Sequence, residues 1–176
     1  EAIVRSDPRS SYHDFAMYGI VWCLMQQEQF AQALQRLQPL LAQERHDSIG
    51  DEARLAQGMC LRKTGQLDQA VAALESFLET QPSGLSLANG LYELGLAYTE
   101  LGKLDPAITS FERIVSQVPD YPALDKVLYE LAWNHQEKGD LSVAARFFEQ
   151  LAQQFPESDH NAEATYMLAQ QQYDAQ

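Results

Sequence analysis

Basic residues, cysteines and long hydrophobic runs are all scarce in this chain of 176 residues, and the first and last of these shortages argue against particular partners. Twelve Lys and Arg residues against 25 Asp and Glu residues give a net charge of −13, which argues against nucleic acid and against an anionic membrane surface as partners. No apolar run approaches the roughly 20 residues that span a bilayer. The charge is compatible with a basic partner.

The same residue types recur at a spacing of 37 residues. An alanine column reads Ala33, Ala70, Ala107 and Ala144. A turn column reads Glu28, Gly65, Gly102 and Gly139, and a column at the end of the units reads Pro8, Arg45, Pro82, Pro119 and Pro156. Each unit holds two stretches with apolar residues three and four apart, which predicts two amphipathic helices. Neither helix can bury its stripe alone, so the units must stack.

The unit from Ala88 to Pro122 carries a known repeat pattern. Its residues are Tyr92, Leu94, Gly95, Tyr98, Gly102, Ala107, Phe111 and Pro119. The chain therefore resembles the tetratricopeptide repeat (TPR) family, although the usual period is 34 residues. The three extra residues fall in the loop after each proline, and this longer form resembles bacterial envelope TPR proteins such as the Tol-Pal partner and the outer-membrane assembly lipoprotein. The resemblance implies an all-α fold, a right-handed superhelical solenoid of stacked antiparallel helix pairs whose first helices line a concave groove.

We expect residues 1–176 to form a single TPR array. Units are expected at about 12–45, 49–82, 86–119 and 123–156, and residues 160–176 are expected to form the first helix of a further unit or a cap. The predicted helices span residues 12–26, 30–41, 51–64, 67–80, 87–101, 105–118, 123–138, 141–155 and 161–173. Glu1 to Pro8 lies in register with Glu112 to Pro119, which favours residues 1–8 as the tail of a preceding unit. We therefore expect the chain to be a fragment of a longer protein.

No residue pattern typical of catalysis or cofactor binding stands out. Cys23 and Cys60 share a column of adjacent units, and stacked helices lie about 8–10 Å apart, too far for a disulfide. We therefore predict two free thiols that pack as small apolar residues. The histidines are expected in loops between units at His13, His46 and His160, and in a core column at His135. No Ser–His–Asp pattern or phosphate loop occurs, so we predict no enzyme, no cofactor and no metal site.

The first helices present columns that we expect to face the groove. The predicted peptide-binding residues are Phe15, Tyr18, Trp22, Met25, Leu55, Met59, Arg62, Tyr92, Leu96, Tyr129, Trp133 and Gln136. Trp and Tyr are preferred anchors at interfaces, and Trp22 and Trp133 occupy one column three units apart. Two alternatives stay open. The tyrosine column could serve only to pack the framework of the repeats, and both tryptophans could be buried against a neighbouring first helix. Some TPR domains bind a C-terminal carboxylate through Lys and Asn in the groove. Here the tryptophan column, in which that Asn would stand, contains no Asn, so we do not expect the groove to bind a C-terminal carboxylate.

These features predict a non-catalytic protein–protein interaction scaffold that binds a peptide or partner segment in its groove. The resemblance implies a bacterial cell-envelope assembly, with the chain in the periplasm or envelope, and otherwise in the cytoplasm. The partner is expected to be a basic or apolar protein or peptide, with no nucleic acid and no membrane insertion, and a homo-oligomer is left open. The alternatives are a self-associating structural scaffold and an accessory TPR module of a larger export machine or enzyme.

Overall fold

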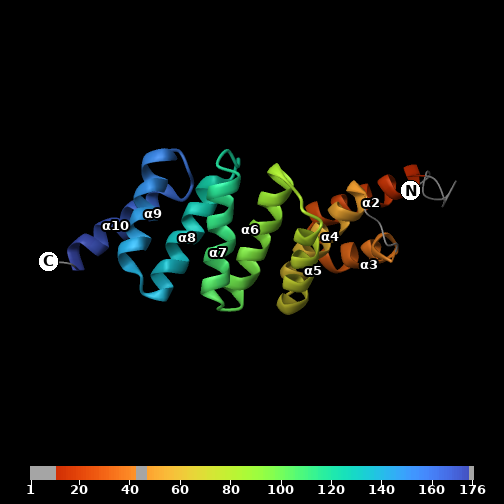
Figure 1. Ribbon diagram of the computed structural model, residues 1–176, viewed down its shortest axis with the longest axis horizontal. Coiled ribbons are helices and arrows are strands. Elements are labelled where there is room, and N and C mark those ends of the chain that lie inside the picture. The colour runs from red at the N-terminus through yellow and green to blue at the C-terminus, as the bar shows by residue number, and fades with distance from the viewer. Residues whose placement is uncertain (1–10, 43–46, 175–176) are drawn as a thin grey trace. The chain divides into compact units, whose positions relative to one another are not determined.

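The computed structural model describes residues 11–42 and 47–174, and within these ranges every regular element is an α-helix (Figure 1). The helices are α2 (Ser11–Gln26), α3 (Phe30–Leu41), α4 (Ser48–Lys63), α5 (Leu67–Glu79), α6 (Gly84–Glu100), α7 (Leu104–Gln117), α8 (Leu124–Lys138), α9 (Leu141–Gln154) and α10 (Asn161–Asp174). None of these helices is long and apolar enough to cross a membrane. The predicted tail at residues 1–8 and His46 lie outside the described residues.

Most predicted helix ends agree with the structure to within one residue, but α4 and α6 each begin three residues earlier than expected. At α4 the carboxylate of Asp47 caps the helix, because its Oδ1 accepts a hydrogen bond of 2.9 Å from the backbone N–H of Gly50. At α6 the first turn carries Leu85, which is 56% exposed. A first turn that buries no apolar side chain leaves no periodic signal in the sequence.

The helices form two compact units, the first ending at Pro82 and the second beginning at Ser83. Unit 1 contains α2 to α5 and unit 2 contains α6 to α10. Within each unit every helix packs against the next one along the chain, and in unit 1 α2 also contacts α4 (Figure 1). This arrangement of packed helix pairs confirms the predicted all-α helical-repeat fold.

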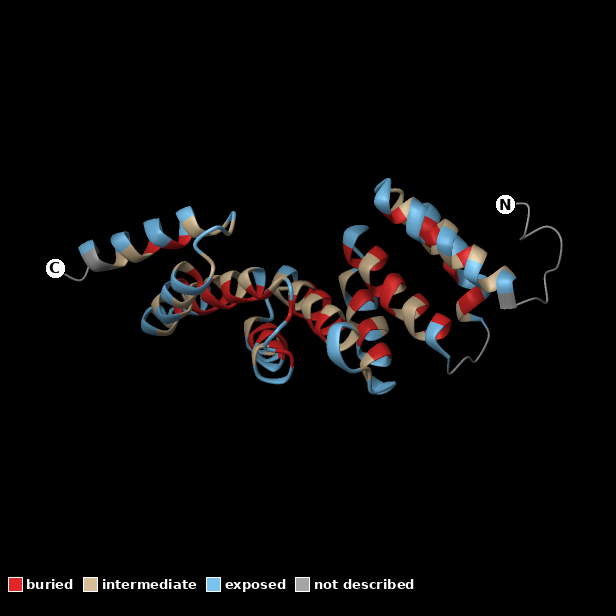
Figure 2. Cartoon of the chain, turned by 90° about the horizontal axis from the view of Figure 1, so that it is seen from above, coloured by how far each residue is buried: buried red, intermediate tan, exposed pale blue. Residues whose placement is uncertain are grey.

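The core of each unit lies along the contact between the two helices of a pair, where Figure 2 shows buried stripes on the helices. All four alanines of the predicted column are fully buried, and so are the residues four positions later, Leu37, Leu74, Phe111 and Phe148. Gly95 allows α6 and α7 to approach closely. A Cβ atom there would lie 2.6 Å from the ring of Phe111, so only glycine fits under this ring.

The turn column confirms its predicted conformation. Gly65, Gly102 and Gly139 have φ angles of +77°, +70° and +89°, in the left-handed region where glycine carries no Cβ penalty. Glu28, the column member without glycine, adopts φ +57° as well. The backbone of the repeat therefore imposes the same turn on glutamate, at a cost of about 1–2 kcal/mol.

Cysteine and histidine positions confirm part of the prediction and correct the rest. Both thiols are free, and Cys60 is fully buried as predicted. The packing predicted for Cys23 is wrong, because its side chain is exposed on a side of α2 that no described helix covers. His135 is buried and His160 lies in a loop, as predicted. The loop predicted for His13 is wrong, because α2 begins at Ser11 and includes this residue.

Candidate functional site

In unit 1 the predicted groove residues of α2 divide by exposure. Phe15 and Trp22 lie seven residues apart, on one side of the helix, and their side chains are 59% and 52% exposed. Tyr18 lies between them and packs half-buried against the core, and its hydroxyl donates a hydrogen bond of 3.1 Å to Oε2 of Glu52 on α4. Phe15 and Trp22 are therefore open to a partner, whereas Tyr18 also ties one first helix to the next.

The other predicted groove residues of unit 1 lie deeper. Met25, Leu55 and Arg62 are each less than a tenth exposed, and Met59 packs half-buried against the core. A partner in this groove would thus contact chiefly Phe15 and Trp22, with the deeper residues supporting the surface from below. The assignment of all seven to a groove stays a prediction.

In unit 2 the five predicted groove residues are all half-buried. They are Tyr92, Leu96, Tyr129, Trp133 and Gln136. Tyr92 packs against two aromatic rings, with centroid distances of 5.9 Å to Phe111 and 6.5 Å to Tyr121. The Tyr121 hydroxyl in turn donates a hydrogen bond of 3.0 Å to Oδ1 of Asn89. Tyr92 therefore takes part in framework packing, the alternative that the sequence left open for its column.

Trp133 lies at the centre of an aromatic cluster that joins three segments. Its ring meets Tyr129 on α8 at 6.2 Å and Phe148 on α9 at 6.0 Å, both edge to face. Tyr129 stacks on His160, in the loop before α10, at 4.2 Å. Nε1 of Trp133 is buried and makes no hydrogen bond within the described residues. The Trp133 side chain therefore packs within unit 2 and remains partly exposed to solvent.

Polar side chains connect successive first helices in unit 2. The Thr99 hydroxyl of α6 lies 3.0 Å from Oδ1 of Asn134 on α8, and the amide of Asn134 donates to the carbonyl of Glu130 at 2.8 Å. From α8 to α10, the Tyr129 hydroxyl donates to Oε2 of Glu163 at 2.8 Å. These contacts fix the spacing of the helices that carry the candidate surface.

The tyrosine hydroxyls of this framework hold their protons tightly. Burial, with the Glu52 carboxylate beside it, raises the pKa of Tyr18 well above its ordinary value. Burial and the hydrogen bond to Glu163 raise the pKa of Tyr129 to about 12. Burial, followed by the charge of Glu93, raises the pKa of Tyr121. All three hydroxyls therefore act as hydrogen-bond donors at neutral pH.

Two exposed aromatic residues on α10 are missing from the predicted set. Tyr166 and Tyr173 are 65% and 78% exposed. The signal was present in the sequence, because Tyr166 shares a column with Tyr18 and Tyr129, and Tyr173 shares one with Met25. None of the described helices covers this side of α10, and a column in the sequence does not encode such spatial neighbours.

Several ionisable side chains of the described residues form structural pairs. Lys138 bridges Asp105 at 2.7 Å and Asp140 at 3.6 Å, while Nδ1 of His135 lies 3.5 Å from Asp140 and its ring stacks on Phe147. No cluster of three or more His, Cys, Asp or Glu side chains suited to a metal ion occurs in this part of the chain.

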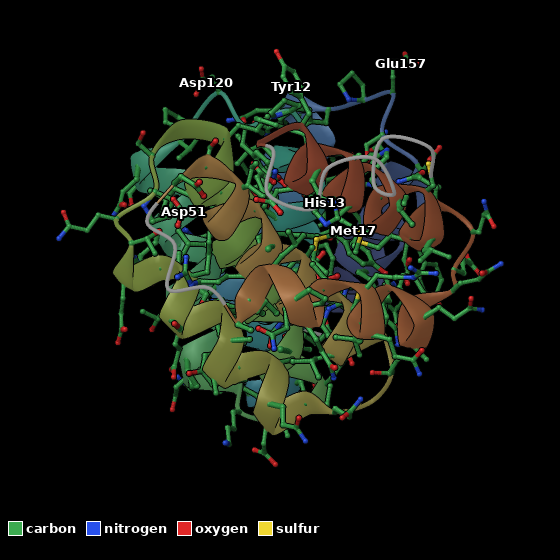
Figure 3. The ribbon with its side chains drawn as sticks, turned by 90° about the vertical axis from the view of Figure 1, so that its right-hand side faces the viewer. Tyr12, His13, Met17, Asp51, Asp120 and Glu157 are labelled. Carbon is green, nitrogen blue, oxygen red and sulfur yellow. The ribbon has the colours of Figure 1, made fainter. Side chains whose placement is uncertain are left out.

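Two shallow surface depressions also lie away from the predicted groove residues. One, of about 330 Å³, is lined by Asp51, Arg54, Ser76, Glu79 and Thr80. The other, of about 380 Å³, is lined by Pro122, Asp125, Gln154, Phe155, Pro156, Glu157 and Ser158. Figure 3 labels Asp51 and Glu157, one from each depression. Neither contains the buried, apolar walls that small-molecule sites usually have.

Two sequence models described as "Tetratricopeptide repeat" match the chain. One matches residues 18–85, and the other matches residues 90–121 and 126–158. The matched stretches follow one another along most of the sequence. A comparison with curated proteins finds no match.

Several solved structures share the fold. PilW, titled a "widely conserved type IV pilus biogenesis factor", is 21% identical with a TM-score of 0.77, over 92% of this chain and 70% of that one. YrrB, titled "a TPR protein with an unusual peptide-binding site", is 15% identical with a TM-score of 0.74, over 95% and 78%. A tetratricopeptide repeat protein from Parabacteroides merdae is 15% identical with a TM-score of 0.75, over 92% and 60%. At these identities the likeness is one of fold.

Proposed function

We propose that this chain, which belongs to the tetratricopeptide repeat family, binds a peptide or partner segment on its first helices, chiefly α2 of unit 1. Proteins of this family are in general non-catalytic scaffolds for protein–protein interactions. The observation that carries the proposal is the exposed aromatic pair Phe15 and Trp22 on α2. Large aromatic side chains held open on a folded surface are typical anchors of an interface.

Unit 2 offers a second part of the same kind of surface. Trp133 and Tyr129 are half-buried on α8, and Tyr166 on α10 is 65% exposed. The hydrogen bond from Tyr129 to Glu163 holds α10 beside α8. Rigid aromatic groups on packed helices lose little conformational entropy when a partner binds, which favours their use as contacts.

The chain's charge favours a basic partner. The net charge is −13, and residues 83–176 contain 14 acidic against 5 basic side chains. A segment that carries Lys or Arg beside apolar residues would be attracted by this field and could place its cations over the exposed aromatic rings.

We infer a bacterial cell-envelope assembly as the setting, in the periplasm or envelope. The longer loop between units supports this setting by its resemblance to envelope proteins of the family. The fold shared with PilW, whose title names type IV pilus biogenesis, also supports it. A self-associating scaffold is the second candidate, because exposed Phe15 and Trp22 could equally receive a second copy of the chain.

Selection from a random peptide library tests the groove proposal, because the library presents many sequences and the groove itself chooses among them. The bait is the whole chain, and the recovered peptides are titrated against the variant with Phe15→Ala and Trp22→Ala. Leu141→Ala is the matched control, because Leu141 is 53% exposed but begins α9, a second helix.

We expect peptides rich in Lys, Arg and apolar residues whose affinity falls at least about tenfold in the double variant and stays unchanged in the control. Peptides that bind the wild-type chain and the double variant equally would contradict the groove proposal. If the wild-type chain sediments in a concentration-dependent way and the double variant does not, the self-associating scaffold is favoured instead.

A further inference from the structure

Unit 2 has a surface depression that the groove proposal leaves unused. It lies where α8 begins and α9 ends, and these two helices pack side by side (Figure 1). Its volume is about 380 Å³, and it is open to solvent. We call it the loop pocket. Its walls are formed by Pro122, Asp125, Gln154, Phe155, Pro156, Glu157 and Ser158.

The open space corresponds to a tyrosine ring in the preceding helix pair. Ser158 lies 37 residues after Tyr121, so the two share a repeat column. Tyr121 is 8% exposed, and its ring packs on Tyr92 at a centroid distance of 6.5 Å. Ser158 has no ring, and its position lines the loop pocket instead. The pair of α8 and α9 therefore has room at this position for a side chain from outside.

Hydrogen bonds hold the two walls of the loop pocket together. Oγ of Ser158 donates to Oδ2 of Asp125 at 2.7 Å, which joins the loop after α9 to the first turn of α8. The backbone N–H of His160 donates to the same Oγ at 3.2 Å. An ionised carboxylate can accept about four hydrogen bonds, so Asp125 is held in place and still has acceptor capacity.

The loop pocket is negatively charged. Asp125 and Glu157 place carboxylates in its walls, and Glu157 is exposed. Residues 119–126 and 155–161 contain four carboxylates but a single Lys or Arg, Lys126, which does not line the pocket. None of the lining residues is basic. The walls therefore attract a cation and offer no partner for an anion.

The C-terminal end of α9 adds to this negative charge. The carbonyl groups in the last turn of a helix carry a partial negative charge. The residue four positions after Ala152 is Pro156, which has no N–H, so the carbonyl of Ala152 lacks its usual helical donor. The last turn of α9 contains no basic residue that would offset the charge. Gln154 and Phe155 line the pocket at this helix end.

The apolar part of the walls favours arginine among the cationic side chains. Phe155 is half-buried, and Pro122 and Pro156 are exposed. A guanidinium is planar, stacks on aromatic rings and forms paired hydrogen bonds with carboxylates, whereas the ammonium of lysine supplies only a point charge. The methylene stem of arginine can pack on the proline rings.

We propose that the loop pocket binds an arginine side chain of a partner polypeptide, with the guanidinium at Asp125 and Glu157 and the stem along Pro122 and Pro156. Because the walls offer no basic residue for the carboxylate of free arginine, the arginine belongs within a chain. The proposal rests on the proposed function in one respect, namely that this chain binds a partner segment. It adds a contact outside the groove and names the residue type that is recognised.

The test titrates the isotope-labelled whole chain with N-acetyl-arginine N-methylamide and follows the backbone amide shifts by NMR. This method suits the weak binding expected of a single side chain. The corresponding citrulline compound is a neutral control of the same shape, and the lysine compound tests the charge without the guanidinium plane. Free L-arginine tests whether the site takes a small molecule.

We expect saturable shifts at the amides of Glu157 and Ser158 with the arginine compound. The citrulline compound should bind at least about tenfold more weakly, because it cannot form charge-assisted hydrogen bonds. The lysine compound should bind with an affinity between the two. Added salt should weaken the binding of the arginine compound, because the pocket is open to solvent.

Three variants locate the contact. Asp125→Asn removes the charge but keeps an oxygen that can accept from Ser158, and it should weaken binding at least about tenfold. Ser158→Tyr supplies the ring that Tyr121 provides in the preceding pair, and it should abolish the shifts while helicity is retained. Asp120→Asn makes the same change of charge at an exposed position outside the pocket and should leave binding unchanged.

The variant with Phe15→Ala and Trp22→Ala should bind the arginine compound as the wild type does. Failure of the groove proposal is thereby distinguished from failure of this one. Equal affinity for the arginine and citrulline compounds would contradict recognition of the charge. Unchanged binding by Asp125→Asn and Ser158→Tyr, or shifts confined to other residues, would place the contact elsewhere. Free L-arginine that binds at least about tenfold more tightly than the capped compound would make the pocket a small-molecule site and overturn the proposal.

Discussion

Tyr129 of α8 donates its hydroxyl proton to Glu163 of α10 across 2.8 Å, and Tyr18 of α2 donates to Glu52 of α4 in the same way across 3.1 Å. In both cases the glutamate follows the tyrosine by 34 residues, three fewer than the repeat spacing. The same pair of columns thus ties successive first helices together in each unit. The tyrosines serve the framework first, and any role toward a partner is added to that.

The bond from Tyr129 predicts a measurable effect on its ionisation. Glu163→Gln removes the negative charge that accepts the hydroxyl proton, so the pKa of Tyr129 should fall from about 12 toward its ordinary value, with burial keeping part of the rise. Ultraviolet absorbance of tyrosinate, recorded against pH, measures this shift. Tyr129→Phe identifies the signal, and Glu149→Gln on α9 is the control that should leave it in place.

The same pKa rise makes stability depend on pH at the alkaline end. In the unfolded chain Tyr129 ionises near pH 10, and in the folded chain near pH 12, so the unfolded state loses its proton first. The contribution of this group is therefore complete below about pH 10 and is lost as pH rises toward about 12. Urea unfolding across this window should show a smaller loss of unfolding free energy in Tyr129→Phe than in wild type. Equal slopes in both proteins would contradict the assignment.

The periodic positions were predictable from the sequence because each is determined by a local geometry that every repeat shares. Ala107 must be small where two helices touch, and Gly102 must adopt a positive φ at the turn. These requirements recur every 37 residues and so appear as columns. The helix-pair fold follows from them, whatever neighbours each unit has in space.

The exposure of individual site residues could not be read from the columns. Trp22 and Trp133 share a column, yet Trp22 is 52% exposed while Trp133 packs edge to face on Phe148 and Tyr129. The residue in the place of Phe148 is Leu37, which offers no ring. Cys23 and Cys60 differ for a similar reason, since α3 covers only the second. The burial of a residue depends on which side chains the neighbouring helices place beside it, and a single sequence column does not contain that information.

The turn at Glu28 predicts a stabilising substitution. Glu28 has φ +57°, where its Cβ crowds the backbone, whereas Gly65, Gly102 and Gly139 occupy the equivalent turns. Glu28→Gly should raise the unfolding free energy by about 1 kcal/mol, because relief of strain exceeds the entropy that glycine adds to the unfolded chain. Thermal unfolding followed by circular dichroism measures it. Glu28→Ala retains the strain and should show no gain.

The alanine column predicts a sharp response to overpacking. Ala107 is fully buried against α6, so Ala107→Leu should lower the unfolding free energy by about 1–3 kcal/mol. Thr109→Leu, at an exposed position of the same helix, adds bulk without entering the contact and should change stability little. An unaltered melting temperature in Ala107→Leu would contradict the register of this helix pair.

Glycine to alanine substitutions at two helical positions should have opposite signs. At Gly95 the new methyl group would lie 2.6 Å from Cε1 and Cζ of Phe111, whose ring is fully buried. Gly95→Ala should therefore lower the unfolding free energy by about 1–3 kcal/mol. At Gly19 the methyl group meets nothing within 4 Å, so only helix propensity acts, and Gly19→Ala should raise the unfolding free energy by about 0.5–1 kcal/mol.

Urea unfolding of the two variants and wild type, at one protein concentration, decides the matter. Both substitutions are chemically identical and both lie inside first helices, so a difference in sign isolates the contact at Gly95 from propensity. A stabilised Gly95→Ala would mean that Phe111 can move aside and that glycine is not required for this helix contact. A destabilised Gly19→Ala would mean that a side chain at position 19 meets a neighbour, against the open space found around it.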